Sequence, residues 1–268
     1  QYEAVRDGTW PSRPLFTTKS ARFNSASSDS LNRAISSTSN RRTATVSCWV
    51  KRSKLGAQQH LWGSSAGSDT TQMNLVFRSG DIIRWDCVLN NGTQFRLETN
   101  AVFRDVSAWY HIVASVDTTQ GTASNRAKLY VNGEEASLAT ATYPSQNLDL
   151  LINYSSFTNY IGTYRNNSLY LSGYLAETIL VDGLQLAPTS FGVANSDGVW
   201  IPAIYTGTYG TNGFNLQFEN AAALGTDSSS NGNTFTVNNL TSLDQSTDYP
   251  EVNFSTLNPL VLIGNTGR

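Results

Sequence analysis

The sequence has few cysteines. Its 268 residues include only Cys48 and Cys87, too few to cross-link a domain of this size. Each lies in a strand-like run, where a free cysteine behaves as a small apolar residue. We therefore expect two free thiols, and a disulfide stays open only if the two strands are neighbours. This cysteine content does not indicate an oxidising compartment.

Charge and long apolar runs are also scarce. Charged residues make up 14% of the chain and the net charge is -2, so no basic field is present to attract nucleic acid or an anionic membrane. No apolar run approaches the roughly 20 residues that span a bilayer, and no signal peptide is recognisable, so membrane insertion is not expected. The chain begins at Gln1 rather than Met. We therefore expect a processed product, an expressed fragment or part of a longer protein.

The few charges are unevenly distributed. Residues 1–60 carry ten Lys/Arg and three Asp/Glu, a net charge of +7, whereas residues 201–268 carry one Arg and five acids, a net charge of -4. Two ends of opposite sign can dock on each other or on a neighbouring copy of the chain. Chance placement of surface charges is the alternative.

In place of charge the chain is rich in Ser, Thr, Asn, Gly and Tyr, which favours strands and turns over helices. The clearest pattern is WYHIVASVDTTQGTASNRAKLYVNG at 109–133. There Ile112, Ala114 and Val116 fall on one face of a predicted strand, a polar loop follows, and an extended pattern resumes before Asn132-Gly133. This pattern predicts a long hairpin that is closed further on by a tight turn.

The same alternation recurs along the chain. TATVSCWVKR at 43–52 predicts another strand, and residues 81–89 and 94–97 predict a second hairpin with a turn at Asn91-Gly92. One short helical turn is expected within 186–191, and no longer helical period is present. Many short strands separated by turns predict an all-β, two-sheet antiparallel sandwich.

Four segments resemble, in the expected order, the laminin-G-like domains of the concanavalin A-like lectin/glucanase family. They are ARFNSASSDSLN at 21–32, TVSCWV at 45–50, the 109–133 hairpin, and NYIG at 159–162 followed by GYLAETILV at 173–181. The resemblance implies a jelly-roll sandwich over residues 21–197, preceded by an N-terminal arm at 1–20.

The remaining residues, 198–268, form a Gly- and aromatic-rich extension. Residues 214–235 resemble the start of another laminin-G-like module, so the extension either adds strands to the first sandwich or begins a second one. Residues 102–113 and 200–260 resemble structural proteins of tailed bacteriophages. This resemblance implies a virion protein, assembled in the host cytoplasm and displayed extracellularly, with other virion proteins as partners.

Because the family includes glucanases, catalysis has to be considered. Retaining glycosidases need two carboxylates about 5 Å apart, and a strand supplies them from acids on one face. No such run exists: Glu134 and Glu135 are adjacent, and Glu177 lies in an apolar strand that favours a structural role. His111 falls at a strand position that favours a structural role, and His60 has no companion acid or nucleophile signature near it. We therefore expect no enzymatic activity.

One loop has the composition of a calcium site. Asp227, Asn231 and Asn233 supply side-chain oxygens at close spacing, and Asp29 lies in another loop of this kind. A hard cation such as Ca²⁺ needs six to eight oxygens, so calcium is a possible cofactor. A simple hydrogen-bonded Asx turn explains the same residues.

A second loop has the composition of a sugar platform, in which an aromatic ring lies beside amides. Its residues are Tyr164, Arg165, Asn166, Asn167 and Tyr170. Many surface loops of Tyr-rich sandwiches share this composition without binding anything.

The sequence thus predicts a non-enzymatic phage virion surface protein of a fibre, tail or head decoration, which adheres to host or environmental glycans. Display on a homo-oligomer would add avidity to weak single sites. The first alternative is a purely architectural virion protein with no glycan site, and the second is a carbohydrate-active enzyme or its binding module. Exposed aromatics would favour the lectin, and two acids converging in a groove would favour the enzyme.

Overall fold

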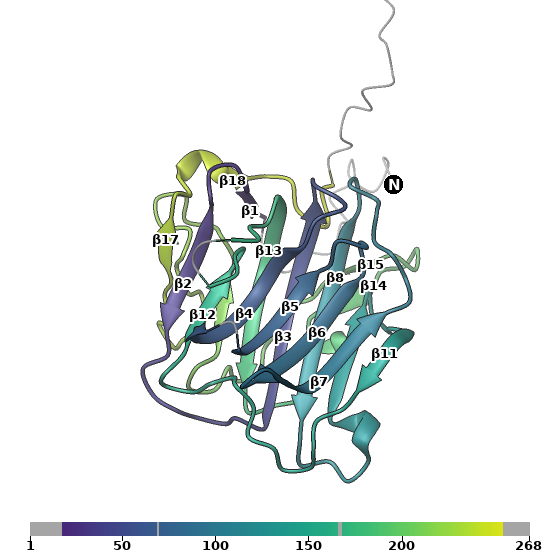
Figure 1. Cartoon of the computed structure of the whole chain (residues 1–268). Helices are drawn as coiled ribbons and strands as arrows, with labels where there is room; N and C mark the ends of the chain where they lie inside the picture. The colour runs from purple at the N-terminus through teal and green to yellow at the C-terminus, as the bar shows by residue number, and fades with distance from the viewer. Residues whose placement is uncertain (1–17, 69, 166–167, 254–268) are drawn as a thin grey trace, which may run out of the picture.

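The computed structural model describes residues 18–253 except 69 and 166–167, and these residues form two antiparallel sheets packed face to face (Figure 1). The first, sheet A, has the order β10 (Glu134–Glu135), β9 (Ala127–Val131), β8 (Trp109–Asp117), β3 (Thr43–Arg52), β13 (Gly173–Asp182), β1 (Ser20–Phe23), β18 (Gln245–Ser246), with β16 (Phe214–Leu216) also on β13. The second, sheet B, has the order β11 (Leu138–Thr142), β7 (Gly92–Thr99), β6 (Ile83–Leu89), β5 (Thr71–Phe77), β4 (Gln59–Ser68), β12 (Thr158–Ile161), β2 (Ser30–Ala34), β17 (Thr236–Asn238). The predicted all-β jelly-roll sandwich is confirmed.

The core between the sheets follows from the alternation in the sequence. Ile112, Ala114 and Val116 of β8 point into it beside Val46 and Val50 of β3, and all five are almost fully buried. In β8 and β3 these positions come into register, with Val46 opposite Ala114. Successive side chains of a strand point to opposite faces, so one face of each strand supplies the core.

The two predicted hairpins form, but one turn falls elsewhere. Asn132 and Gly133 have φ of 50° and 89°, as a type I′ turn requires. In the hairpin between β6 and β7 the positive φ values belong to Asn90 and Asn91, at 50° and 65°, and Gly92 is the first residue of β7. The turn predicted at Asn91-Gly92 therefore lies one residue earlier, because Asn tolerates the left-handed region and a bulge at Cys87 shifts the register.

Helices are confined to short 3₁₀ turns. The described residues form them at Ala123–Asn125, Pro188–Ser190 and Ser242–Asp244. The second is the helical turn predicted within 186–191. None of the helices found in the described ranges is long and apolar enough to cross a membrane.

Both cysteines are free and buried. Cys48 lies in β3 of sheet A and Cys87 in β6 of sheet B. Burial raises the pKa of each thiol to about 12, so both remain protonated, unreactive apolar groups.

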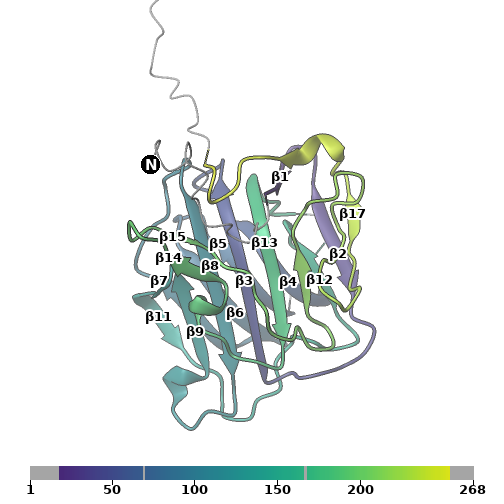
Figure 2. The same ribbon diagram turned by 180° about the vertical axis from the view of Figure 1, so that it is seen from behind.

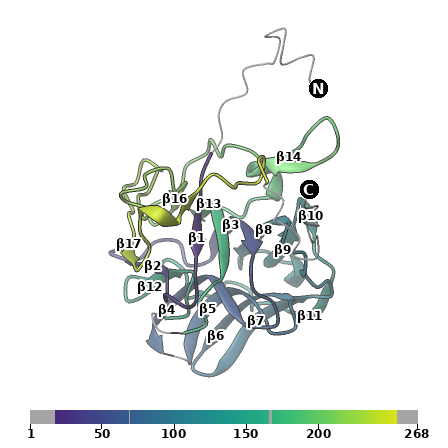
Figure 3. The ribbon, with the colours of Figure 1, turned by 90° about the horizontal axis from the view of Figure 1, so that it is seen from above.

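The outer face of sheet A is covered by the chain that follows β13. Val113 of β8 and Ile179 and Val181 of β13 point outward, and Phe191 packs on them. Seen from behind, this segment and the small β14 (Gly192–Ala194) and β15 (Trp200–Pro202) pair lie in front of sheet A (Figure 2). Viewed from above, they form a partial third layer (Figure 3). The central strands β8, β3 and β13 of sheet A are therefore buried on both faces.

Trp200 anchors this third layer. Its indole N–H donates to His111 Nδ1 at 2.9 Å, and the two rings stack at 6.1 Å. Because an indole nitrogen only donates, His111 carries its proton on Nε2, which lies 2.9 Å from Ser47 Oγ and donates to it. Gly192 is required beneath the indole, since a Cβ there would lie 2.6 Å from the Trp200 ring.

The described part of the C-terminal extension adds strands to both sheets. β16 pairs with β13 and β18 with β1 in sheet A, whereas β17 pairs with β2 in sheet B. Ion pairs reinforce this attachment: Arg22 contacts Asp244 at 2.9 Å and Lys51 contacts Asp248 at 2.8 Å. The oppositely charged ends of the chain could dock on each other or on a neighbouring copy. In the structure they contact each other within one chain. The first 17 residues of the predicted arm lie outside the described residues.

Candidate functional site

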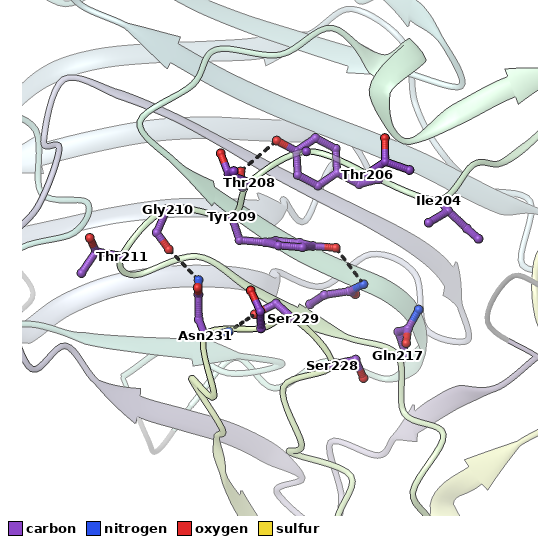
Figure 4. A pocket seen from close by; sticks show the side chains of 14 residues that line it. Ile204, Thr206, Thr208, Tyr209, Gly210, Thr211, Gln217, Ser228, Ser229 and Asn231 are labelled. Carbon is purple, nitrogen blue, oxygen red and sulfur yellow. Dashed lines mark hydrogen bonds between the residues drawn. The ribbon is translucent and has the colours of Figure 1, made fainter.

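A pocket of about 720 Å³ lies on the outer side of sheet A, built almost wholly by the extension (Figure 4). Three pieces of chain line it: residues 204–211, Asn215 with Gln217, and residues 228–231. We refer to it as the 204–231 pocket. Its volume lies in the range of small-molecule sites, about 300–1,000 Å³.

The polar floor of the pocket comes from β16 and the residue after it. Phe214 and Leu216 point into the main core, so the alternating side chains of Asn215 and Gln217 point outward. Since β16 is paired with β13, these two amides stand on a rigid sheet rather than on a free loop.

Two tyrosines supply the apolar part of the pocket. Tyr205 and Tyr209 meet edge to face, with ring centroids 5.1 Å apart, and Tyr205 packs on Phe191. The Tyr209 hydroxyl accepts a hydrogen bond from Asn215 Nδ2 at 3.3 Å. Burial raises the pKa of Tyr209 and the Glu177 carboxylate raises it further, so this phenol stays neutral. Each ring therefore presents a neutral, partly buried aromatic surface.

The segment that carries Tyr209 is held by backbone contacts. The N–H of Asp182, at the end of β13, donates to Tyr209 O at 2.8 Å, and the Asp182 carboxylate accepts from Asn212 N at 2.9 Å. Gly210 has φ of +72°, and a Cβ there would lie 2.2 Å from Asp182 O. Only glycine fits this approach, so the local sequence fixes the position of the ring.

The residues predicted to bind calcium form the wall beneath the pocket. The buried Asp227 carboxylate accepts from the backbone nitrogens of Asn215, Ser229 and Asn233 at 2.9, 2.9 and 2.6 Å, and from Ser229 Oγ at 2.8 Å. Asn231 Nδ2 donates to two backbone carbonyls, those of residues 210 and 213.

This donor set fits a hydrogen-bonded turn better than a cation. Both oxygens of Asp227 are already occupied, and the Arg33 guanidinium donates to Asn233 Oδ1, which places a positive charge where a metal would bind. Asp29, in the other candidate loop, accepts from Asn24 N at 2.9 Å. Among the residues that the structure describes, no group of three or more His, Cys, Asp or Glu side chains is placed to hold a metal. The calcium site stays a prediction.

Replacement of Asp227 by alanine separates the two interpretations. We expect the free energy of unfolding to fall by about 2 kcal/mol, because buried N–H and O–H donors lose a charged acceptor. The loss should be the same in calcium and in a chelator when thermal unfolding is followed by circular dichroism. A wild-type midpoint that rises with added calcium would support the metal site instead.

The structure places the two tyrosines of the loop predicted to bind glycans in different surroundings. Tyr164 packs on the His60 ring with centroids 4.8 Å apart, and Arg165 lies over the Tyr164 ring at 4.9 Å. Tyr170 lines a different cavity of about 680 Å³, beside Asn238. Asn166 and Asn167, at 166–167, fall outside the described residues. The glycan role of this loop stays a prediction.

The candidate acids and histidines occupy structural positions. Glu134 and Glu135 form the exposed strand β10, and Glu177 accepts from Gln217 Nε2 at 3.3 Å. Burial lowers the pKa of His111 to about 3. Burial, aided by the charge of Arg78, lowers that of His60 to about 3 as well. Both imidazoles are neutral near pH 7, and neither has a carboxylate among its described hydrogen-bond partners.

Comparison with known proteins places the fold in a family. The family model for the concanavalin A-like lectin/glucanases superfamily matches residues 24–183, more than half of the chain. The chain therefore belongs to this superfamily. None of the curated proteins compared with it matches.

Solved structures with a similar fold are distant in sequence. The native heptameric SAP-like pentraxin of Limulus polyphemus is 14% identical, with a TM-score of 0.45 over 63% of this chain and 77% of that one. Domains LG4-5 of the mouse laminin alpha1 chain are 12% identical, with a TM-score of 0.45 over 78% of this chain and 50% of that one. The CBM40 of the Ruminococcus gnavus IT-sialidase, bound to alpha2,3 sialyllactose, is 12% identical, with a TM-score of 0.42 over 60% of this chain and 89% of that one.

The 204–231 pocket was missed by the sequence reasoning. Its signal is the composition of TGTYGTNG at 206–213, which sets an aromatic near an amide as the 164–170 loop does. On composition alone, residues 164–170 and 206–213 are equally good candidates. Only the pairing of β16 with β13 shows which one stands on a rigid support.

Proposed function

We propose that this chain is a non-enzymatic, glycan-binding virion surface protein of a bacteriophage, and that the 204–231 pocket is its sugar site. The observation that supports it is the pocket itself, which sets two tyrosine rings beside side-chain amides and hydroxyls. A sugar ring has an apolar face, which packs on an aromatic, and a polar rim, which needs hydrogen-bonding groups. The superfamily assignment is consistent with this chemistry.

Two further parts of the proposal rest on other grounds. The virion setting, in a fibre, tail or head decoration, is supported by the resemblance of residues 102–113 and 200–260 to phage structural proteins. The lining of the pocket supports the non-enzymatic character, because no Asp or Glu is among the described residues that line it. Glycosidases need a pair of carboxylates in the groove.

Binding to a glycan array, followed by titration of the best sugar, tests the site. Replacement of Tyr209 by alanine should weaken that affinity about tenfold, because the sugar loses its aromatic platform. Tyr170→Ala, in the other cavity, is the matched control and should leave affinity unchanged. Circular dichroism checks that both variants are folded. If Tyr170→Ala abolishes binding and Tyr209→Ala does not, the site lies in the 164–170 loop.

The architectural alternative has an observation of its own. Val193 and Val199, on the projecting β14–β15 hairpin, are 44% and 55% exposed (Figure 3). Apolar side chains on a projection suit a contact with another subunit. Light scattering of the native protein tests this idea: an assembly that Val199→Asp dissociates, with no binding on the array, would favour architecture over adhesion.

A further inference from the structure

The lining of the 204–231 pocket carries no charged side chain. Residues 204–211, Asn215, Gln217 and 228–231 are all neutral. A carboxylate or sulfate that leaves water needs a cation or several N–H donors in return. The lining provides no cation, so its hydroxyls and the orientation of its amides decide which ligand it accepts.

Two amides are oriented by partners that can only accept. Gln217 donates Nε2 to the Glu177 carboxylate at 3.3 Å, and Asn231 donates Nδ2 to the carbonyl oxygens of Gly210 and Gly213 at 2.5 and 2.9 Å. An ionised carboxylate and a backbone carbonyl have no hydrogen to give, so the nitrogen of each amide must face them. The oxygens Gln217 Oε1 and Asn231 Oδ1 are therefore the groups left for a ligand.

A third amide, that of Asn215, has a hydroxyl as its partner, which can accept or donate. Asn215 donates Nδ2 to the Tyr209 hydroxyl, and the side chain is 6% exposed. Its Oδ1 has no hydrogen-bond partner among the residues that the structure describes. This oxygen is itself buried, so the amide oxygens that a ligand can reach are those of Gln217 and Asn231.

Glu177 holds the first of these amides from an unusual backbone position. It has φ of 43° within a bulge of β13, where the register with β3 shifts between Ala176 and Ile179. A non-glycine residue in the left-handed region inside a strand is uncommon, and bulges redirect side chains beside binding sites. The bulge places a carboxylate behind Gln217, where it fixes the amide and adds negative charge near the pocket.

We infer that the 204–231 pocket selects uncharged, hydroxyl-rich saccharides and rejects acidic ones, an inference that rests on the proposed function. A sugar hydroxyl donates to an amide oxygen, whereas a carboxylate or sulfate has no hydrogen to donate there and finds only the uncharged hydroxyl donors of the lining Ser, Thr and Tyr side chains. The lining residues that the structure describes also offer no cation that would attract an anion. Glu177 and Gln217 act together as the specificity element, with Glu177 as a positioning residue.

The test uses pairs of polysaccharides that differ only in charge. Polygalacturonate is compared with its carboxyl-reduced form, and kappa-carrageenan with its desulfated form, by titration against the intact protein. We expect the neutral member of a bound pair to bind at least tenfold more tightly. Tighter binding of the acidic member, lost in Tyr209→Ala, would overturn the selectivity while leaving the proposed site intact. No binding to these pairs or to a broad glycan array would overturn both.

Variants of the specificity element give a second readout. In Glu177→Gln the new side-chain amide can donate to Gln217 as well as accept from it. Gln217 can then turn Nε2 toward the ligand, so the preference for the neutral polysaccharide should fall several-fold. Gln217→Glu leaves the bulge untouched and should weaken acidic ligands further. Its control, Gln94→Glu in β7, adds the same charge in sheet B and should leave the ratio unchanged. A ratio unaffected by both pocket variants would contradict the inference, since a purely structural role would change stability alone.

Discussion

Replacing Asp248 with alanine will lower the free energy of unfolding by about 3–5 kcal/mol, because the buried Lys51 ammonium loses its ion pair with the Asp248 carboxylate. Lys51 and Asp248 are 1% and 8% exposed, and Nζ lies 2.8 Å from Oδ2. The other carboxylate oxygen accepts from Trp109 Nε1 at 3.0 Å, so one substitution breaks both contacts. Urea unfolding followed by tryptophan fluorescence measures the loss.

A double variant separates the cost of an unpaired charge from a loss of packing. With Lys51→Met and Asp248→Asn combined, no charge remains, and the amide oxygen of the new side chain can still accept from Trp109. We expect this variant to recover most of the stability lost in Asp248→Ala, as buried ion pairs replaced by neutral groups often do. If the double variant were as unstable as the sum of its single changes, the two residues would be uncoupled and the interpretation would fail.

The sandwich itself could be predicted because its determinants are local. Alternation in 109–117 and 43–52 selects the inward faces of β8 and β3, and Asn132-Gly133 has the φ preference of the turn it forms. The turn at Asn90-Asn91 shows where this reasoning fails. A bulge changes the register by one residue without changing the composition, so the better turn dipeptide, Asn91-Gly92, was selected wrongly.

The burial of the outer face of sheet A could not be predicted. Trp200 reaches His111 across 89 residues, and Asp248 reaches Lys51 across 197. No periodicity encodes such pairings, because each residue alone is an ordinary strand or loop residue. The charge asymmetry between the ends of the chain was the one sequence signal that indicated contact between them.

For the same reason, only part of the candidate site could be predicted from the sequence. Asp227 and Asn231 have the spacing of metal ligands, and in the structure Asp227 accepts from a backbone N–H while Asn231 donates to a backbone carbonyl. Spacing shows that oxygen-bearing groups lie close together, but it does not show which N–H donors already occupy them. The composition of a loop likewise does not show whether its residues stand on a paired strand.

The stability of the protein will begin to fall as the pH drops below about 6.5, before most carboxylates start to titrate. His60 and His111 are 1% and 0% exposed, and burial holds the pKa of each at about 3, whereas an unfolded histidine titrates near its ordinary value of about 6.5. Between these values the unfolded state binds a proton at each histidine that the folded state does not. Stability therefore falls as pH falls through this window, by about 1.4 kcal/mol per pH unit for each histidine and about 2.7 for both.

Unfolding free energies measured from pH 6 down to pH 4.5 isolate this effect, because most carboxylates stay ionised there. His60→Gln and His111→Gln should each halve the slope, since glutamine does not titrate, and the double variant should leave it near zero. The slope is the informative quantity, because either substitution changes the absolute stability by altering packing and the hydrogen bond to Ser47 or Gln58. A slope unchanged by both variants would mean that the histidines are protonated in the folded protein, which the indole N–H of Trp200 facing His111 Nδ1 opposes.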